Sequence, residues 1–160
     1  MSTLEKAVAD FLAQRHIAVA GVSRNPAEAA NLIYRKLRES GYDVYAINPN
    51  ADEVEGDRCY PDLASVPVRL DGVVAVTPPA ATAALVEDCA ALSIPRVWMH
   101  RGLGAGSVSA TAVEHGRVHG IEVIPGACPM MFLEPVDVGH RCIRGVSRLV
   151  GRLPEPVLAV

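Results

Sequence analysis

Hydrophobic residues follow two alternating patterns along the chain. Apolar positions recur at helical spacing over residues 4–12, 27–40, 81–92 and 107–119, where Ser107 is a good N-cap residue. Between these segments lie short, continuously apolar runs, at residues 16–22, 42–47, 72–76, 96–99 and 121–124. Strands that are apolar throughout are typical of a parallel sheet covered by helices on both faces. The pattern therefore predicts an α/β fold.

The order of these elements also predicts a topology. Strands that alternate with helices form a parallel sheet with right-handed crossovers, and we expect about five strands in the doubly wound order 3-2-1-4-5. Ligands of such sheets bind beyond the carboxyl ends of the strands. We expect the site near the switch between the first strand, residues 16–22, and the fourth, residues 96–99.

Composition excludes several classes of protein. Half of the 160 residues are apolar and 21% are charged, which excludes a disordered chain. A formal charge of −3 and 4% aromatic residues argue against a nucleic-acid partner. No apolar run approaches the ~20 residues of a membrane span, and the acidic, amphipathic N-terminus fits neither a signal nor a transit peptide. We expect a cytoplasmic protein.

The C-terminal segment has a pattern of its own. Residues 136–153 place apolar side chains on one helical face and four arginines elsewhere. We expect one domain over residues 1–135, with residues 136–160 forming an amphipathic helix and tail. This helix would pack on the domain, on a second copy of the chain or on a partner protein, rather than on a membrane.

The first strand leads into a candidate anion-binding loop, which has the sequence Gly21-Val22-Ser23-Arg24-Asn25-Pro26. Gly21 permits close backbone approach, and Asn25 could cap a helix that has Pro26 at its first position. A helix N-terminus attracts anions, and Arg24 could add a direct phosphate contact. An ordinary strand-to-helix turn remains the alternative. The G-x-G-x-x-G fingerprint of dinucleotide binding is absent, as is an acidic residue at the end of the second strand.

Five sequence runs, taken in order, resemble a known family: Val19–Pro26, Gly41–Pro49, Gly56–Tyr60, Val97–Gly102 and Cys128–Pro129. They are similar to the small stand-alone CoA-binding proteins and to the CoA-binding domain at the start of the succinyl-CoA synthetase alpha subunit. The resemblance covers roughly residues 12 to 132 and implies a Rossmann-like three-layer domain that binds coenzyme A or acyl-CoA.

The resemblance also implies roles for particular residues. Gly21, Val22 and Ser23 would form the phosphate loop, and Asn48 and Pro49 would line the nucleotide groove. Two further segments would flank the cofactor at the ends of the third and fourth strands: Thr77-Pro78-Pro79 and His100-Arg101-Gly102. This chain departs from the family at two positions, where it has His100 in place of Gln and Ala30 in place of Ser; the latter leaves Asn31 as the nearest polar group.

We expect this chain to bind a ligand rather than to catalyse a reaction. The synthetase uses a phosphorylated histidine and a glutamate on a further domain, and this chain has no counterpart of that domain. We therefore expect no catalytic residues and a non-catalytic role as a carrier, sensor or subunit. The alternatives are an NADP-type enzyme, with Arg24 on the phosphate, and a thiol-redox protein that uses Cys128 as a reactive thiol near the sheet edge.

The remaining cysteines and histidines carry weaker signals. Cys59 and Cys89 lie among apolar residues and are expected to be buried and inert. His115 and His119, four residues apart on a predicted helix, could provide half of a metal site. The spacing offers no third ligand, so we expect a solvated helix face and no metal.

Overall fold

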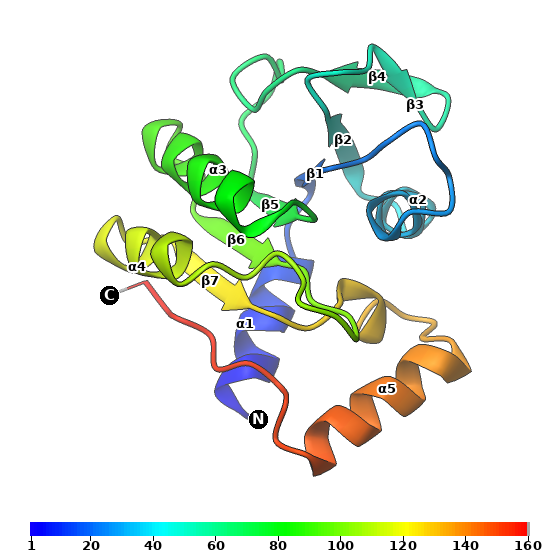
Figure 1. Ribbon diagram of the computed structural model, residues 1–160, viewed down its shortest axis with the longest axis vertical. Coiled ribbons are helices and arrows are strands. Elements are labelled where there is room, and N and C mark those ends of the chain that lie inside the picture. Colours follow the sequence, from blue (N-terminus) through cyan, green and yellow to red (C-terminus); the bar gives the residue numbers. More distant parts are fainter. Residues whose placement is uncertain (160) are drawn as a thin grey trace.

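The computed structural model describes residues 1–159 as a mostly parallel sheet between two layers of helices (Figure 1). The strands are β1 (His16–Ala20), β2 (Asp43–Ile47), β3 (Glu53–Val54), β4 (Asp57–Tyr60), β5 (Gly72–Ala75), β6 (Arg96–Met99) and β7 (Glu122–Pro125). The helices are α1 (Thr3–Leu12), α2 (Ala29–Glu39), α3 (Pro79–Ala91), α4 (Ala110–Val118), the short 3₁₀ helix η1 (Pro129–Met131) and α5 (Val138–Leu149). The predicted α/β, Rossmann-like fold is confirmed.

Strand side chains alternate between two cores. Ile17 and Val19 of β1 face one side with Trp98 of β6, where α1, α2 and η1 cover them. Ala18 and Ala20 face the other side, where α3 and α4 pack. Figure 1 shows α3 and α4 together on one side of the sheet and α2 on the other. Because both faces are covered, the strands carry apolar residues at consecutive positions.

The strand order differs from the prediction in one respect. The sheet runs β3-β4-β2-β1-β5-β6-β7, so β5, predicted as the third strand, pairs directly with β1. The place beyond β2 is taken by β4, a short strand that we had not predicted. The chain continues from β2 through the two-residue β3, which pairs antiparallel with β4. The topological switch therefore lies between β1 and β5 rather than between β1 and β6.

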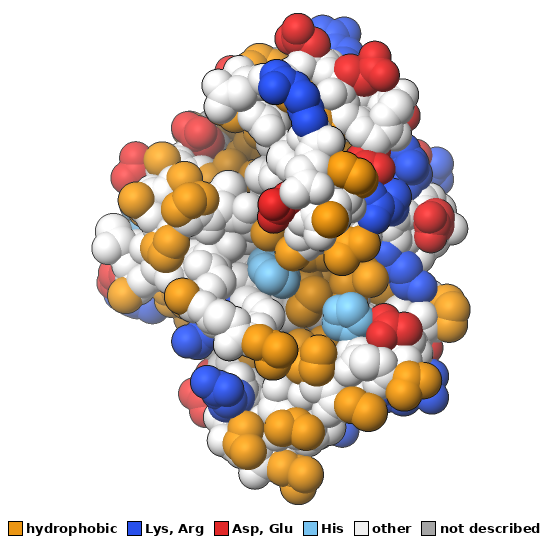
Figure 2. Space-filling model, turned by 45° about the vertical axis from the view of Figure 1, so that its right-hand side comes forward, with side chains coloured by type: hydrophobic (Ala, Val, Ile, Leu, Met, Phe, Trp, Pro, Cys, Tyr) orange, Lys and Arg blue, Asp and Glu red, His pale blue; other side chains and the backbone are white. Residues whose placement is uncertain are grey.

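The C-terminal helix lies against η1, beside the sheet. Arg144 of α5 donates a hydrogen bond to the Met131 carbonyl over 2.9 Å, and Arg148 pairs with Glu5 of α1 at 2.6 Å. No residue of α5 is buried; Val138, Val146 and Leu149 are exposed, whereas Ile143 packs against the core. Figure 2 shows apolar side chains gathered over the lower part of the molecule, where Figure 1 places α5.

The tail after α5 returns to the sheet. Val157 and Val123 of β7 exchange two backbone hydrogen bonds of 2.8 Å, so the tail covers the outer edge of β7. An edge strand with free backbone groups is a template for unwanted pairing, and the tail removes that template here. No helix among residues 1–159 combines the length and apolarity needed to cross a membrane.

Candidate functional site

Gly21 brings three strand ends together. Its N–H donates to the carbonyl of Ile47 at the end of β2 over 3.0 Å, while Val76, just after β5, donates to Ala20 of β1 over 3.0 Å. Gly21 has φ +99°, and a Cβ at this position would lie 2.1 Å from the Val76 carbonyl oxygen. Only glycine combines this backbone conformation with so close an approach. The backbone of β1 therefore turns away from the sheet at the switch point.

The loop after Gly21 is held by Asn31 of α2, which is 1% exposed. The Asn31 side chain accepts a hydrogen bond from the Ser23 N–H (3.0 Å) and donates to the Ser23 carbonyl (2.7 Å) and to Glu55 (2.6 Å). Arg35 pairs with the same carboxylate at 2.8 Å. The hydrogen bond from Asn31 is the largest cause of a lowered pKa at Glu55. The pairing with Arg35 lowers this pKa further, and together they outweigh the opposite effect of partial desolvation. These hydrogen bonds connect the loop to α2 and to Glu55.

The predicted helix start in this loop is wrong. Helix α2 begins at Ala29, its N-cap is Glu28, and no side chain caps it. Asn25 instead accepts a hydrogen bond from the Ala27 N–H at 3.1 Å, the geometry of a local turn, and Pro26 precedes the helix. The loop is longer than predicted because Asn31, one turn into the helix, holds Ser23 rather than leaving the helix to start at Asn25.

Two backbone donors in the loop remain free. Among residues 1–159, the N–H groups of Val22 and Arg24 have no hydrogen-bond acceptor. Val22 as a whole residue has a relative exposure of 0%, so its N–H is enclosed, whereas Arg24 is exposed. The Arg24 side chain donates to the carbonyl of Asn50, which places its guanidinium beside the turn after β2. Asn48 joins the same two loops by donating to the Val22 carbonyl over 2.8 Å.

A cavity of about 330 Å³ opens at the ends of β1, β2 and β5. It contains four of the thirteen predicted contact residues: Gly21, Asn48, Pro49 and Thr77. The other lining residues were not predicted; they are Ala20, Ile47, Pro61, Asp62, Leu63, Ala81, Ala84, Leu85 and Asp88. We call this cavity the switch-point groove.

Two acids of the groove had sequence signals that we did not connect to a site. Asp88 interrupts the apolar stripe of α3, and Asp62 follows the unpredicted strand β4. Asp62 accepts hydrogen bonds from the N–H (2.8 Å) and hydroxyl (2.7 Å) of Ser65, and these bonds lower its pKa. Asp62 is therefore a hydrogen-bond acceptor at neutral pH, close to an apolar wall.

Thr77 lies where β5 meets α3. Its N–H donates to the buried Ser107 hydroxyl over 2.9 Å, and its own hydroxyl lies 2.8 Å from that of Thr82. Pro78 is the N-cap of α3 and Pro79 its first residue, so the two prolines set the start of the helix without lining the groove. Ser107 was predicted to cap the next helix, but α4 begins later: Ser109 is its N-cap and Ser107 serves Thr77 instead.

The residues that follow β6 do not line the switch-point groove. Arg101 and Gly102 line a second cavity of about 380 Å³, formed with the end of β7 and the C-terminal segment. His100 lines neither cavity, and its ring lies over Gly102. Burial, and then the charge of nearby His140, lower the pKa of His100, so the imidazole is neutral at pH 7. Six of the thirteen predicted residues thus line one of the two cavities, and the other seven line neither.

The candidate thiol is enclosed. Cys128 is 6% exposed and packs in the core beside α1 and α2. Burial raises its pKa to about 11, so the thiol stays protonated at neutral pH. The predicted burial of Cys59 and Cys89 is confirmed. On α4, the rings of His115 and His119 stack at 4.1 Å, and residues 1–159 contain no group of three metal-ligating side chains.

A doubly wound sheet with a glycine at its switch point and a groove beyond its strand ends defines a Rossmann-like ligand-binding domain. The chain belongs to the CoA-binding domain family, whose model matches residues 15–134. This match confirms the resemblance noted in the sequence.

Individual relatives agree with this assignment. Acetate–CoA ligase (ADP-forming) I of Archaeoglobus fulgidus is 27% identical over 118 residues, which are 70% of this chain and 17% of the ligase. The chain thus spans less than a fifth of that ligase. A hypothetical protein from Pyrococcus horikoshii OT3 has a similar structure, with a TM-score of 0.76 and 26% identity over 85% of this chain and 92% of that one.

The fold also recurs within a larger enzyme. The dinucleotide-forming acetyl-coenzyme A synthetase 1 of Ca. Korarchaeum cryptofilum, in complex with phosphate and ADP, matches 91% of this chain with 37% of its own. The TM-score is 0.64 and the identity 23%, so this likeness shows the fold alone.

Proposed function

We propose that the chain binds coenzyme A or acyl-CoA, with the nucleotide end of the cofactor in the switch-point groove. The observation that carries the proposal is the groove at the ends of β1, β2 and β5, which Gly21, Asn48 and Thr77 line. A glycine at the switch point lets a ligand approach the backbone there. Membership of the CoA-binding domain family supports CoA as that ligand.

The loop residues Gly21 to Asn25 would bind the phosphates. The N–H of Arg24, an exposed residue, has no acceptor of its own among the described residues, and the N-terminus of α2 has no side-chain cap. Free N–H groups at a helix start attract an anion by about 0.3 to 1 kcal/mol for each charge. The Arg24 guanidinium, which lies beside the turn after β2, adds a positive charge.

The groove itself would bind the adenosine. Its walls carry Ile47, Leu63 and Leu85, which offer an apolar surface to the base. The carboxylates of Asp62 and Asp88 can accept hydrogen bonds from the adenine amino group or the ribose hydroxyls. Asn48, Pro49 and Thr77 complete the lining at the ends of β2 and β5.

The pantetheine arm would leave the groove along the sheet edge. Pro78 and Pro79 fix the start of α3 beside this path, and His100, Arg101 and Gly102 lie at the end of β6. The neutral imidazole of His100 can form a hydrogen bond with an amide of the arm without adding a charge.

We propose a non-catalytic role as a carrier, sensor or subunit. The protonated, buried state of Cys128 supports this role, because a thiol with a pKa of about 11 is a poor nucleophile at neutral pH. The NADP-type enzyme remains the second candidate, since Arg24 could equally contact a ribose phosphate.

Calorimetric titration with CoA, acetyl-CoA, NAD, NADP and ATP tests the proposal. We expect CoA and acetyl-CoA to bind more tightly than the others. Ser23→Asp adds a negative charge beside the phosphates and should weaken CoA binding at least tenfold, a difference of about 1.4 kcal/mol. Ser93→Asp adds the same charge at an exposed left-handed position after α3, φ 55°, which Asp tolerates, and should bind CoA like the wild type.

Two results would contradict the proposal. Binding of NADP without binding of CoA would favour the hypothesis of an NADP-type enzyme. Equal CoA affinity in Ser23→Asp and the wild type would mean that the phosphates lie elsewhere.

A further inference from the structure

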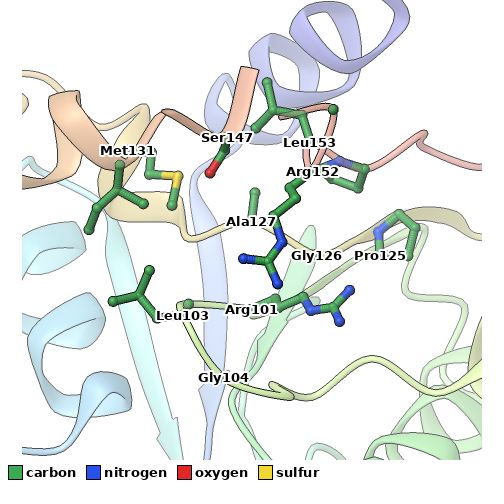
Figure 3. A pocket seen from close by; sticks show the side chains of 14 residues that line it. Arg101, Leu103, Gly104, Pro125, Gly126, Ala127, Met131, Ser147, Arg152 and Leu153 are labelled. Carbon is green, nitrogen blue, oxygen red and sulfur yellow. The ribbon is translucent and has the colours of Figure 1, made fainter. Parts of the chain in front are cut away.

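The second cavity, of about 380 Å³, lies between the ends of β6 and β7 and the C-terminal segment (Figure 3). One wall comes from residues inside the region matched by the family, among them Arg101, Gly126 and Met131. The opposite wall comes from residues 143–154, beyond that region. The cavity therefore depends on the C-terminal segment. Its size is within the usual range for small-molecule sites, about 300 to 1,000 Å³.

The loop that carries Arg101 is hydrogen-bonded at both of its ends. The Arg101 N–H donates to the Ala127 carbonyl over 2.9 Å, and Ser107 donates to the His100 carbonyl over 2.8 Å. Between these bonds, Gly106 has φ +70°, and a Cβ there would lie 2.6 Å from the His100 carbonyl oxygen. Both ends of the loop are thus attached to the sheet edge.

The charge of the cavity is unbalanced. Arg101 and Arg152 are its charged lining residues, and no acidic residue lines it. Figure 3 shows Arg101 from the loop and Arg152 from the tail extending into the space between these two segments. Among residues 1–159, neither guanidinium forms an ion pair or a hydrogen bond, whereas six other arginines pair with carboxylates. Two unpaired guanidinium groups beside one cavity favour an anion between them.

Part of the remaining surface of the cavity is apolar. Met131, Ile143 and Leu153 contribute hydrophobic side chains, and Ser147 contributes a hydroxyl. Inorganic phosphate would leave this surface unused, whereas an acid with a short hydrocarbon chain would contact both the arginines and the apolar wall.

We propose that this cavity binds a small organic carboxylate with a short apolar body, held by Arg101 and Arg152. The cavity shares no lining residue with the switch-point groove, and its Arg101 and Gly102 lie at the end of β6, beside the path proposed for the pantetheine arm. It goes beyond the proposed CoA binding by giving the chain a second ligand, and the C-terminal segment the role of completing its site.

Titrations followed by backbone amide NMR test this site, with hexanoate, hexanamide and inorganic phosphate as probes. Hexanoate should shift the backbone amide resonances of Gly102, Gly104 and Gly126 at the cavity, and the amide resonance of Gly21 should stay unchanged. Hexanamide has the same shape without the charge and should bind at least tenfold more weakly. Arg152→Gln and Arg101→Gln should each weaken hexanoate binding about tenfold, and Arg69→Gln, an exposed arginine outside the cavity, should not.

Each opposite result overturns the proposal. Equal binding of hexanamide would show that the charge of the ligand is not recognised, and unchanged binding in both arginine variants would show that Arg101 and Arg152 do not hold it. Saturation by phosphate without a response to hexanoate would show that the site does not recognise an apolar body. Loss of CoA binding in Arg152→Gln, with the fold intact by circular dichroism, would make the cavity part of the CoA site rather than a separate one.

Discussion

Replacing Gly21 with alanine perturbs the switch point directly, and Gly41 provides a matched control. Both glycines have similar positive φ angles, +99° and +92°, but a Cβ at Gly41 would meet nothing within 4 Å. Alanine in a left-handed conformation costs roughly 1–2 kcal/mol at either position. At Gly21 the new Cβ would lie 2.1 Å from the Val76 carbonyl oxygen, so β1 and β5 must separate, with an overpacking cost of about 1–3 kcal/mol more.

Thermal unfolding and CoA titration measure the two consequences. In a domain of this size 1 kcal/mol shifts the melting temperature by roughly 2–4 °C. Gly41→Ala should therefore lower it by about 2–8 °C and Gly21→Ala by about 4–20 °C, summing the two costs. Gly21→Ala should also weaken CoA binding, because the loop must shift, whereas Gly41→Ala should bind normally. Equal melting temperatures and equal CoA affinities in the two variants would refute the reasoning.

Two further predictions concern titratable groups. The lowered pKa of His100 means that the unfolded chain takes up a proton before the folded chain does, so the free energy of unfolding should fall as pH drops below about 6.5. Urea unfolding at pH 7.5 and 5.5 should show a smaller loss for His100→Gln than for the wild type, and an equal loss would contradict the assignment. Iodoacetamide should label the native protein at exposed Cys142 but not at Cys128, as judged by intact mass at pH 8, and Cys142→Ser should remain unlabelled. A label, or a CoA adduct after incubation with CoA disulfide, on Cys128 would restore the thiol-redox alternative.

The hydrophobic pattern determined the elements of the fold. The runs at residues 16–22, 42–47, 72–76, 96–99 and 121–124 correspond to β1, β2, β5, β6 and β7, because strands buried on both faces must be apolar at consecutive positions. The helices followed from equally local signals, namely apolar spacing and the glycines that follow helix ends.

The strand order required information that lies outside these runs. β4 has four residues, Asp57 to Tyr60, and β3 has two, so neither produces a periodic signal. β4 lies beyond β2 near the sheet edge, where exposed Arg58 is tolerated as one of its side chains. Because β4 takes the place beyond β2, β5 pairs with β1 instead, and the switch point lies between β1 and β5.

Local signals also misplaced two helix starts. Asn25 followed by Pro26 has the sequence of a helix start, as does Ser107, yet both polar side chains serve the strand-end loops instead. Asn31 holds Ser23, and Ser107 holds Thr77, across the fold. A cap that competes with a long-range hydrogen bond can be identified only when both partners are placed.

The sequence by itself therefore determined the α/β fold, the glycine loop at the end of β1 and the family. The tertiary structure decided which residues share a cavity: it brought Asp62 and Asp88 to the switch-point groove and placed Arg101 opposite Arg152. The physical reason is that secondary structure depends on side chains a few positions apart, whereas a cavity depends on strand order and on how loops and the tail cross the sheet edge.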